Sequence, residues 1–487
     1  MESVGIWIFA SVLPVVLILH MIIPDVGRRN VVLIAAGLLM IGLIQPLALL
    51  FYLIISRITF KMALNIRRGK LHTLLVPLGI NLLALFLLKY LDAAATQLGL
   101  SSGILLTPTN LLIDWLNGFG LSIDHAVSLA PVGIGFYTLS VISYLVDIYR
   151  GRHPAEKRYG SFMLYLFLFP KFFNGPVVRY GQIVSNLNQR RNSSQQVLFG
   201  MLRFVTGLGK KVLLADVCGR MILELTESGS RQALIGSWLA AVLFFFQIYF
   251  DFSGCCDMAI GLGRVFGFRF PENFKKPYQA MSVTEFCECW NITVRKFFLD
   301  YVYYPLGAKK GIIGKFAAAV AAAVLYGLWH GGSYNFIIFG VYFAAIITIE
   351  KHIEYILTDL PYWLRHTLTV LALMLGWVIF SHENLSELSV AIKAMIGDGG
   401  FYISGDGARV WAAIPTLILC WIGVTSIPEN FRDFWRKTLD MGEKQKDKPI
   451  LRMMYYLSCI VFMIGVLWIC IASWIQNPAL PPVMMSL

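Results

Sequence analysis

The stretch Gly327-Leu-Trp-His-Gly-Gly-Ser-Tyr-Asn-Phe-Ile-Ile-Phe-Gly340 places a single histidine, His330, between two apolar segments. These segments, Phe316–Leu328 and Phe336–Ile349, contain no charged side chain, so His330 is expected at membrane depth. An ionisable group there costs about 2–3 kcal/mol or more, and such groups usually mark a functional site. Because imidazole accepts and returns a proton near neutral pH, His330 is a candidate general base. The alternative is a neutral histidine that is satisfied by a helix carbonyl.

The composition indicates a protein with many membrane-spanning helices. Of the 487 residues, 57% are hydrophobic and 14% are charged, and the mean hydropathy is +0.68. A soluble protein of this length could not bury so much apolar surface. The net charge of +13 is spread over short basic clusters between apolar runs, as the positive-inside rule produces. We therefore expect the lipid bilayer, and not a nucleic acid, as the partner of these charges.

The apolar runs predict an all-α polytopic membrane protein with about eleven transmembrane or re-entrant helices, counted at roughly 20 residues per span. The first run has no basic leader or small-residue cleavage site, so it is expected to be a retained helix. The second contains Pro46, which favours two pieces bent at the proline. No internal repeat is visible, which disfavours a repeat-built transporter. The expected pieces are Ile6–Ile23, Val31–Ile55, Leu74–Leu88, Ala126–Val146, Phe162–Phe173, Leu234–Phe250, Phe316–Leu328, Phe336–Ile349, Leu364–Phe380, Val410–Ser426 and Tyr455–Trp474. Two further segments, the amphipathic Val197–Leu214 and the Gly-rich Met258–Phe268, lie among them.

Between these runs we expect an interfacial segment at Asp92–Asp124, with an amphipathic stretch at Leu105–Leu116, and a charged cytoplasmic connector at Glu429–Arg452. The whole chain, residues 1–487, is expected to form one integral-membrane domain whose last spans lie within residues 410–475. The eight cysteines show no metal-ligand spacing, so free thiols are expected and no metal site is predicted.

Six stretches, taken in order, carry a family resemblance. The last three contain polar groups that hydrocarbon tolerates only when they have partners. The stretches are Pro131–Thr138, Ser143–Arg150, Phe169–Tyr180, Asp251–Phe274, Ser282–Gly307 and Trp329-His330-Gly331. Together they resemble the membrane-bound O-acyltransferase superfamily, and specifically its bacterial alginate O-acetyltransferase branch, with the best match over residues 131–340. A sister branch transfers D-alanine to teichoic acid.

The resemblance implies a horseshoe of helices around a thinned centre, with a cytoplasmic funnel for an acyl thioester and an opposite pocket for a hydroxyl acceptor. It also implies that His330 is the catalytic histidine and that Asn291, a few dozen residues upstream, is its partner. Acyl transfer needs a base for the hydroxyl proton and a donor for the developing oxyanion. The alternative for Asn291 is an interhelical hydrogen bond, worth about 0.6 kcal/mol on average.

Five further residues are candidates for lining the substrate pocket, because they lie in the same stretches. They are Trp329, Trp290, Asp251, Asp257 and Asp300. For Asp251 and Asp257 we favour a role in helix packing over a catalytic one.

The sequence departs from the usual pattern of the branch at three places. The usual Trp-Arg-Arg-Trp-His is Cys287-Glu-Cys-Trp-Asn291 here, the usual Phe-Arg-Asp-Tyr is Phe298-Leu-Asp-Tyr301, and the usual Tyr-His is Tyr342-Phe343. Four nearby basic residues could compensate electrostatically for the missing arginines, or they could have a general role at the membrane surface. They are Lys275, Lys276, Arg295 and Lys296.

The leading hypothesis is transfer of an acetyl or other short acyl group, across a bacterial plasma membrane, to a hydroxyl of a cell-surface or secreted polysaccharide. The donor would be a cytoplasmic thioester, either acetyl-CoA or an acyl-carrier protein, with no bound cofactor. The resemblance implies a periplasmic or extracellular acetyltransferase as a further partner. The alternatives are D-alanyl transfer to teichoic acid from a carrier-protein thioester, a transporter of a polysaccharide or lipid intermediate, and a catalytically degenerate scaffold.

Overall fold

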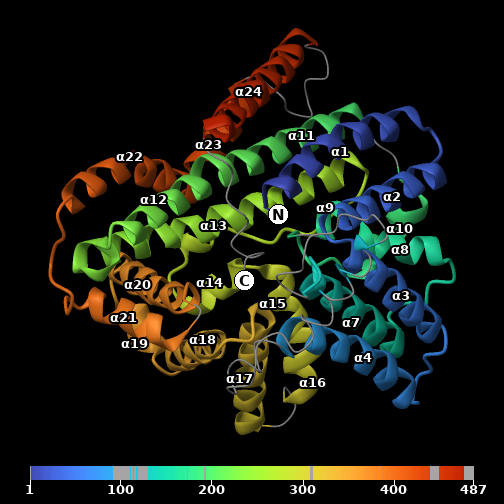
Figure 1. The fold of residues 1–487 in the computed structure, drawn as a ribbon, viewed down its shortest axis with the longest axis horizontal. Helices are drawn as coiled ribbons and strands as arrows, with labels where there is room; N and C mark the ends of the chain where they lie inside the picture. Colours follow the sequence, from blue (N-terminus) through green and yellow to red (C-terminus); the bar gives the residue numbers. More distant parts are fainter. Residues whose placement is uncertain are drawn as a thin grey trace.

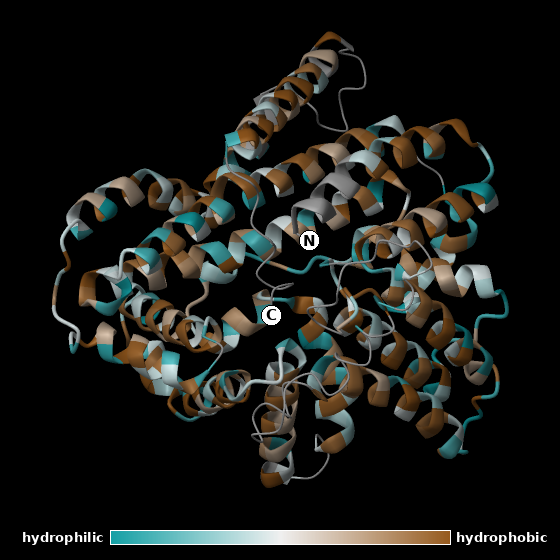
Figure 2. Cartoon of the chain, in the orientation of Figure 1, coloured by the Kyte–Doolittle hydropathy of each residue, from teal (hydrophilic) through white to brown (hydrophobic). Residues whose placement is uncertain are grey.

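The computed structural model describes residues 2–91, 110, 113–114, 117–118, 130–172, 174–190, 193–307, 311–382, 384–438 and 449–476. Within these residues the secondary structure is helical and contains no strand (Figure 1). Nine of the helices in these ranges are long and apolar enough to cross a membrane. Hydrophobic residues dominate these helices, and hydrophilic residues gather at their ends and in the loops (Figure 2). The prediction of an all-α polytopic membrane protein is confirmed. The expected segment at Asp92–Asp124, including Leu105–Leu116, lies almost entirely outside the described residues.

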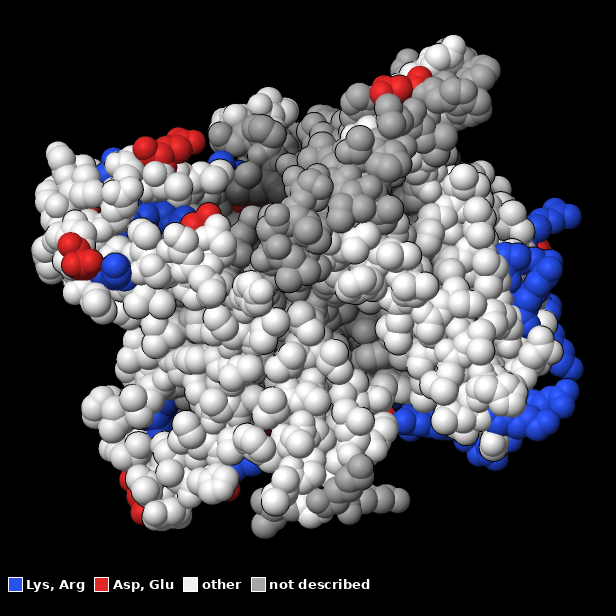
Figure 3. All heavy atoms as spheres, turned by 60° about the horizontal axis from the view of Figure 1, so that its bottom comes forward, with Lys and Arg blue, Asp and Glu red and all other residues white. Residues whose placement is uncertain are grey.

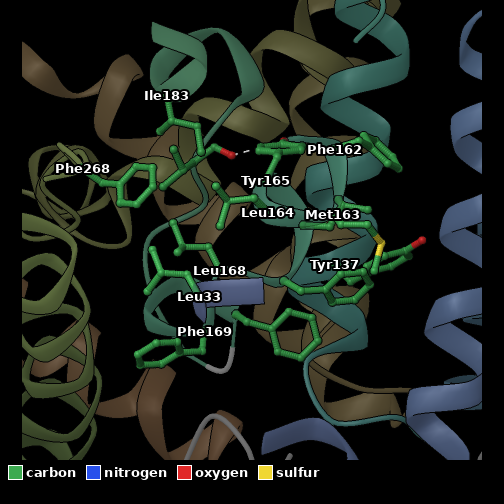
Figure 4. Close-up of a cluster of buried hydrophobic side chains, with 14 of the residues drawn as sticks. Leu33, Tyr137, Phe162, Met163, Leu164, Tyr165, Leu168, Phe169, Ile183 and Phe268 are labelled. Atoms are coloured by element: carbon green, nitrogen blue, oxygen red, sulfur yellow. Dashed lines mark hydrogen bonds between the residues drawn. The ribbon is translucent and has the colours of Figure 1, made fainter. Parts of the chain in front are cut away.

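The N-terminal helices form one side of the molecule around an aromatic core. They are α1 (Glu2–Ile22), α2 (Val26–Ile44), α3 (Pro46–Ala63), α4 (His72–Leu85) with the π-helical turn η1 (Phe86–Tyr90), α7 (Ile134–Arg150), α8 (Tyr159–Phe167), α9 (Phe169–Phe172) and α10 (Tyr180–Asn188). In this core Leu33, Leu164 and Ile183 from three helices pack together (Figure 4). The Tyr165 hydroxyl donates to the carbonyls of Ser140 and Val178, at 3.0 and 3.3 Å, so its buried polar atom is satisfied.

The chain breaks at Pro46, as the sequence predicts. Helix α2 ends at Ile44, Gln45 adopts extended backbone angles, and Pro46 is the first residue of α3. Proline is tolerated in the first helical turn because its missing N–H would have no partner there. The two pieces are 19 and 18 residues long, so each can cross a membrane by itself. Helix α3 continues past the expected end of this run at Ile55, to Ala63.

The centre of the molecule is built on α11 (Ser194–Gly209), the π-helical turn η2 (Lys210–Ala215), α12 (Asp216–Glu227) and α13 (Leu234–Val265). The sequence predicts a span at Leu234–Phe250 and a separate glycine-rich piece at Met258–Phe268, but the structure has one helix of 32 residues. The separation is wrong because the glycines serve close packing. A Cβ on Gly254 or Gly261 would lie 2.6–2.7 Å from a backbone oxygen of α11, so small residues let the two backbones meet.

The C-terminal half continues through the centre and the opposite side of the molecule (Figure 1). Its helices are α14 (Val283–Cys289), α15 (Ile292–Phe298), the π-helical turn η5 (Leu299–Tyr303), α16 (Tyr304–Leu306), α17 (Gly311–His330), α18 (Tyr334–His352), α19 (Glu354–Asp359), α20 (Tyr362–Phe380), α21 (Leu385–Met395), α22 (Asp406–Val424), α23 (Ile427–Thr438) and α24 (Pro449–Gln476). The connector at Glu429–Arg452 begins within α23, and its residues 439–448 lie outside the described ranges.

Lys and Arg side chains gather along one edge of the molecule (Figure 3). We call this the basic edge and define it by exposed residues of the α3–α4 and α7–α8 connections: Arg67, Arg68, Lys70, Arg152, Lys157 and Arg158. The Arg68 guanidinium donates to the Arg150 carbonyl at 2.5 Å, which joins the start of α4 to the end of α7. From this edge α4 and η1 run 19 residues inward, about 28 Å at 1.5 Å per residue.

Candidate active site

His330 is the last residue of α17, directly before the turn that leads to α18. Its side chain is buried, with 6% of its surface exposed. The two helices pack closely because each has a glycine at the contact. A Cβ on Gly327 would lie 2.0 Å from the Phe336 carbonyl oxygen, and one on Gly340 would lie 2.3 Å from that of Ala323. The glycines of the Gly327–Gly340 stretch therefore fix the position of His330 at the end of a rigid helix pair.

The imidazole of His330 lies among aromatic rings. The rings of Trp329, Phe380 and Tyr326 have their centroids 4.8, 5.0 and 5.1 Å from that of the imidazole. Phe336 and Phe339 follow at 6.2 and 6.4 Å. The Nε2 atom of His330 makes no hydrogen bond to any residue that the structure describes. A buried imidazole nitrogen that is not used by the fold can take part in proton transfer.

Two residues of the N-terminal turn η1 hold the end of α17. The Lys89 ammonium donates to the carbonyls of Trp329 (2.8 Å) and His330 (3.0 Å). The Tyr90 hydroxyl donates to the Leu328 carbonyl at 2.7 Å. The last four carbonyls of a helix have no partner within it, so these side chains satisfy three of the four. The sequence shows only a lysine at the end of an apolar run, and no pattern in it names the partner.

Asn291 lies between α14 and α15 in a left-handed backbone conformation, with φ of 42°. Asparagine tolerates this region better than most residues. The Asn273 amide nitrogen donates to the Asn291 side-chain oxygen at 3.1 Å. The Asn273 oxygen in turn accepts from the backbone N–H and the hydroxyl of Thr293, at 3.0 and 2.7 Å. Asn273 therefore orients Asn291 so that its amide nitrogen points away from this network.

Tyr326 lies between the two candidate catalytic residues. The Asn291 amide nitrogen donates to the Tyr326 hydroxyl oxygen at 3.4 Å, and the Tyr326 ring packs edge-on against His330. The structure shows no direct hydrogen bond between Asn291 and His330 among the described residues. Tyr326 is four residues before His330, so the two share one face of α17. The four-residue spacing from His330 could have identified Tyr326 as a site residue from the sequence. The position of Asn273 within the Asp251–Phe274 stretch was a weaker indication of its role.

The two tryptophans expected near the substrate lie in different surroundings. Trp329 packs against Phe136 of α7 at 5.3 Å between centroids, next to His330. Its Nε1 makes no hydrogen bond within the described part of the chain. Trp290 precedes Asn291 and belongs to an aromatic cluster with Trp377 (4.8 Å), Phe274 (5.0 Å) and Phe286 (5.3 Å). Trp329 is thus a direct neighbour of the histidine, whereas Trp290 supports the Asn291 turn.

The aspartates of α13 form ion pairs with the α11–η2 segment. Asp251 lies 2.8 Å from the Lys211 ammonium, which also contacts Asp216 at 2.6 Å. Asp257 contacts Arg203 at 2.8 Å and Lys210 at 2.7 Å. These contacts support the packing role that the sequence favours for both residues.

Asp300 belongs to a polar network between η5 and the end of α7. Its carboxylate contacts the Arg179 guanidinium at 2.5 Å, and its backbone carbonyl accepts from Arg150 at 3.1 Å. The neighbouring Tyr301 hydroxyl donates to Asp147 at 2.9 Å. Burial raises the pKa of the Tyr301 phenol, so it remains a neutral donor. Asp300 therefore lies toward the basic edge and not beside His330.

Two of the four basic residues near the altered motif already have acidic partners. Lys276 contacts Glu429 at 2.5 Å, and Arg295 contacts Glu288 at 2.9 Å. For these two residues, the ion pairs favour a structural role over replacement of the missing arginines.

Comparison with known proteins identifies the family to which this chain belongs. The model of the MBOAT, membrane-bound O-acyltransferase family matches residues 158–381, which include both Asn291 and His330. The chain is 33% identical over 338 residues to a probable alginate O-acetylase of Pseudomonas putida, covering 67% of this chain and 69% of that protein. A probable alginate O-acetylase of Pseudomonas syringae is 34% identical over 65% of this chain, and the match spans 62% of its own length. The peptidoglycan O-acetyltransferase of Helicobacter pylori is 27% identical over 60% of this chain and 61% of its own length. The chain belongs to the membrane-bound O-acyltransferase family.

Proposed function

We propose that this protein is a membrane O-acyltransferase that moves an acetyl or other short acyl group from a thioester to a hydroxyl of a cell-surface or secreted polysaccharide. The observation that carries the proposal is the buried His330 imidazole, whose Nε2 is not used by the fold and whose helix end is fixed by other side chains. The names of the relatives, acetylases of alginate and of peptidoglycan, support the acetyl group and the polysaccharide acceptor.

The reaction assigns a separate task to each residue. His330 takes the proton of the acceptor hydroxyl as the oxygen attacks the acyl carbonyl carbon, and a tetrahedral oxyanion forms. The C–S bond then breaks, the ester remains on the acceptor, and the imidazolium returns the proton to the departing thiolate. The Tyr326 hydroxyl accepts from Asn291 and keeps its own proton, so it is free to donate toward the oxyanion or the acceptor.

The donor would approach from the cytoplasmic side of a bacterial plasma membrane. Acetyl-CoA and the prosthetic group of an acyl-carrier protein both carry phosphate, which a basic surface attracts. The basic edge is expected to face the cytoplasm by the positive-inside rule. The polysaccharide, or a secreted acetyltransferase that passes the group onward, would receive it on the opposite side.

This orientation predicts which introduced cysteines a membrane-impermeant thiol reagent can label. Lys157→Cys, on the basic edge, should be labelled only after the membrane is permeabilised. Asp398→Cys should be labelled in intact cells, because the exposed loop around it contains no Lys or Arg from Ile396 to Ala408 and lies at the other end of the molecule (Figure 1). The wild-type chain measures background from its native thiols. Labelling of Lys157→Cys in intact cells would reverse the proposed orientation.

The function itself is tested by mass analysis of cell-surface polysaccharides from cells with and without this chain, grown with isotope-labelled acetate. We expect labelled acetyl groups on one polymer only in cells that carry the chain. Appearance of an alanyl mass would instead identify the D-alanyl branch. A polymer that is missing from the surface, and not merely unacylated, would support a transporter and contradict the proposal.

A further inference from the structure

The π-helical turn η1 brings Lys89 and Tyr90, two consecutive residues, to the end of α17. Their hydrogen bonds cover the carbonyls of Leu328, Trp329 and His330 in order. The Lys89 ammonium also lies 5.8 Å from the centroid of the Tyr90 ring, so the two side chains point the same way. This contact could not be predicted from the sequence, because Lys89 and Trp329 are 240 positions apart.

A cation at this place interacts favourably with α17 in two ways. The C-terminal end of a helix carries partial negative charge from its unpaired carbonyls, which an ammonium group complements. Direct hydrogen bonds from a charged donor are also about twice as strong as neutral ones. Lys89 has both, and it is held on a turn with π-helical geometry, a feature that often occurs at functional sites.

The contact of Lys89 with α17 affects the position of His330, because His330 is the last residue of that helix. Helix ends fray, and hydrogen bonds to the last carbonyls oppose this fraying, which would move the imidazole away from its aromatic neighbours. The carbonyl that Lys89 holds at 3.0 Å belongs to His330 itself. The fixed position of the imidazole therefore depends on a side chain of η1 as well as on the packing of α17 against α18.

We propose that Lys89, supported by Tyr90, is a positioning residue that fixes the catalytic histidine for acyl transfer. This inference rests on the proposed function. Lys89 acts through the backbone of Trp329 and His330, and it does not take the proton of the acceptor. A displacement of about 1 Å in a catalytic group can lower a rate by roughly 10²-fold, which sets the size of the expected effect.

The experiment compares Lys89→Met, Lys89→Arg, Tyr90→Phe and Lys393→Met in sealed membrane vesicles. The donor is a labelled acetyl thioester, and the acceptor is surface polysaccharide isolated from cells that lack this chain. Lys89→Met should lower kcat by about 10²-fold with an unchanged KM for the donor, because binding of the donor does not use Lys89. Lys89→Arg should recover most of the rate, since it restores the charged donor. Tyr90→Phe should have a smaller effect, because one carbonyl of the three loses its partner. Lys393→Met removes an exposed lysine and should match the wild type.

Hydrogen–deuterium exchange of the last turn of α17 provides a readout that does not depend on activity. Faster exchange at residues 327–334 in Lys89→Met, with unchanged exchange in α13, would support positioning. A kcat within twofold of the wild type, or a rise in KM with kcat retained, would overturn the inference. If neither the wild type nor any variant transferred acyl groups, the proposed function would fail, and the exchange measurement would still decide whether Lys89 holds the helix end.

Discussion

Replacing His330 with glutamine is expected to lower the rate of acyl transfer by roughly 10²–10⁴-fold, the usual contribution of general acid–base catalysis. Glutamine keeps a planar polar group of similar size in the aromatic surroundings, but it cannot take a proton at neutral pH. The rate should be measured in sealed vesicles with a labelled acetyl thioester, after the amount of protein in the membrane has been matched. Because the substitution removes a proton acceptor, kcat should fall more than the affinity for either substrate.

The control for this experiment is His352→Gln at the other end of α18. His352 is exposed, and its Nδ1 lies 2.7 Å from the Thr348 carbonyl, so its role is confined to the helix end. This variant should retain the wild-type rate. A His330→Gln protein that folds normally and keeps more than a tenth of the rate would show that His330 is not the general base. The neutral, structurally satisfied histidine would then be the better interpretation.

Replacing Lys211 with methionine is expected to destabilise the protein by about 3–5 kcal/mol, the cost of removing one partner from a buried ion pair. The Lys211 ammonium lies 2.6 Å from Asp216 and 2.8 Å from Asp251, and the side chains of these carboxylates are 1% and 0% exposed. Without the cation, two buried carboxylates repel each other in a region of low dielectric. Thermal unfolding of the detergent-purified protein, followed by intrinsic fluorescence, measures the loss.

The adjacent lysine supplies a matched control. Lys210 contacts Asp257 at 2.7 Å, but Arg203 contacts the same carboxylate at 2.8 Å. Lys210→Met therefore leaves Asp257 with a partner and should cost less than Lys211→Met. The triple variant Lys211→Met, Asp216→Asn, Asp251→Asn should recover part of the stability, because it also removes the two buried negative charges that Lys211 neutralises. Equal losses for the two lysine variants would contradict a specific role for the Lys211 pair.

The break at Pro46 and the position of His330 followed from the sequence because both depend on local rules. Proline lacks the N–H that a continuing helix needs, so the end of α2 and the start of α3 are set by one residue. His330 stands between two uncharged runs, and such runs become helices wherever the bilayer excludes water. The structure places it at the junction of α17 and α18, as these runs predict.

The continuous helix α13 could not be predicted in the same way. Asp251 and Asp257 interrupt the apolar run, and the glycines that follow are poor helix formers in isolation. In the folded chain the aspartates pair with Lys211, Lys210 and Arg203, and Gly254 and Gly261 meet the α11 backbone. Packing against α11 thus overrides the local preference, and this information is spread over two distant segments.

The sequence by itself determined the membrane class, the family and the identity of the candidate catalytic histidine and asparagine, because apolar run length, charge placement and short motifs are all local properties. Only the tertiary structure decided which side chains surround and hold these residues. Asn291 is oriented by Asn273 and meets His330 through Tyr326, and the end of α17 is held by Lys89 from η1. The physical reason is that a hydrogen bond requires its donor and acceptor atoms to lie within about 3.5 Å of each other. Only the packing of distant helices brings such atoms together.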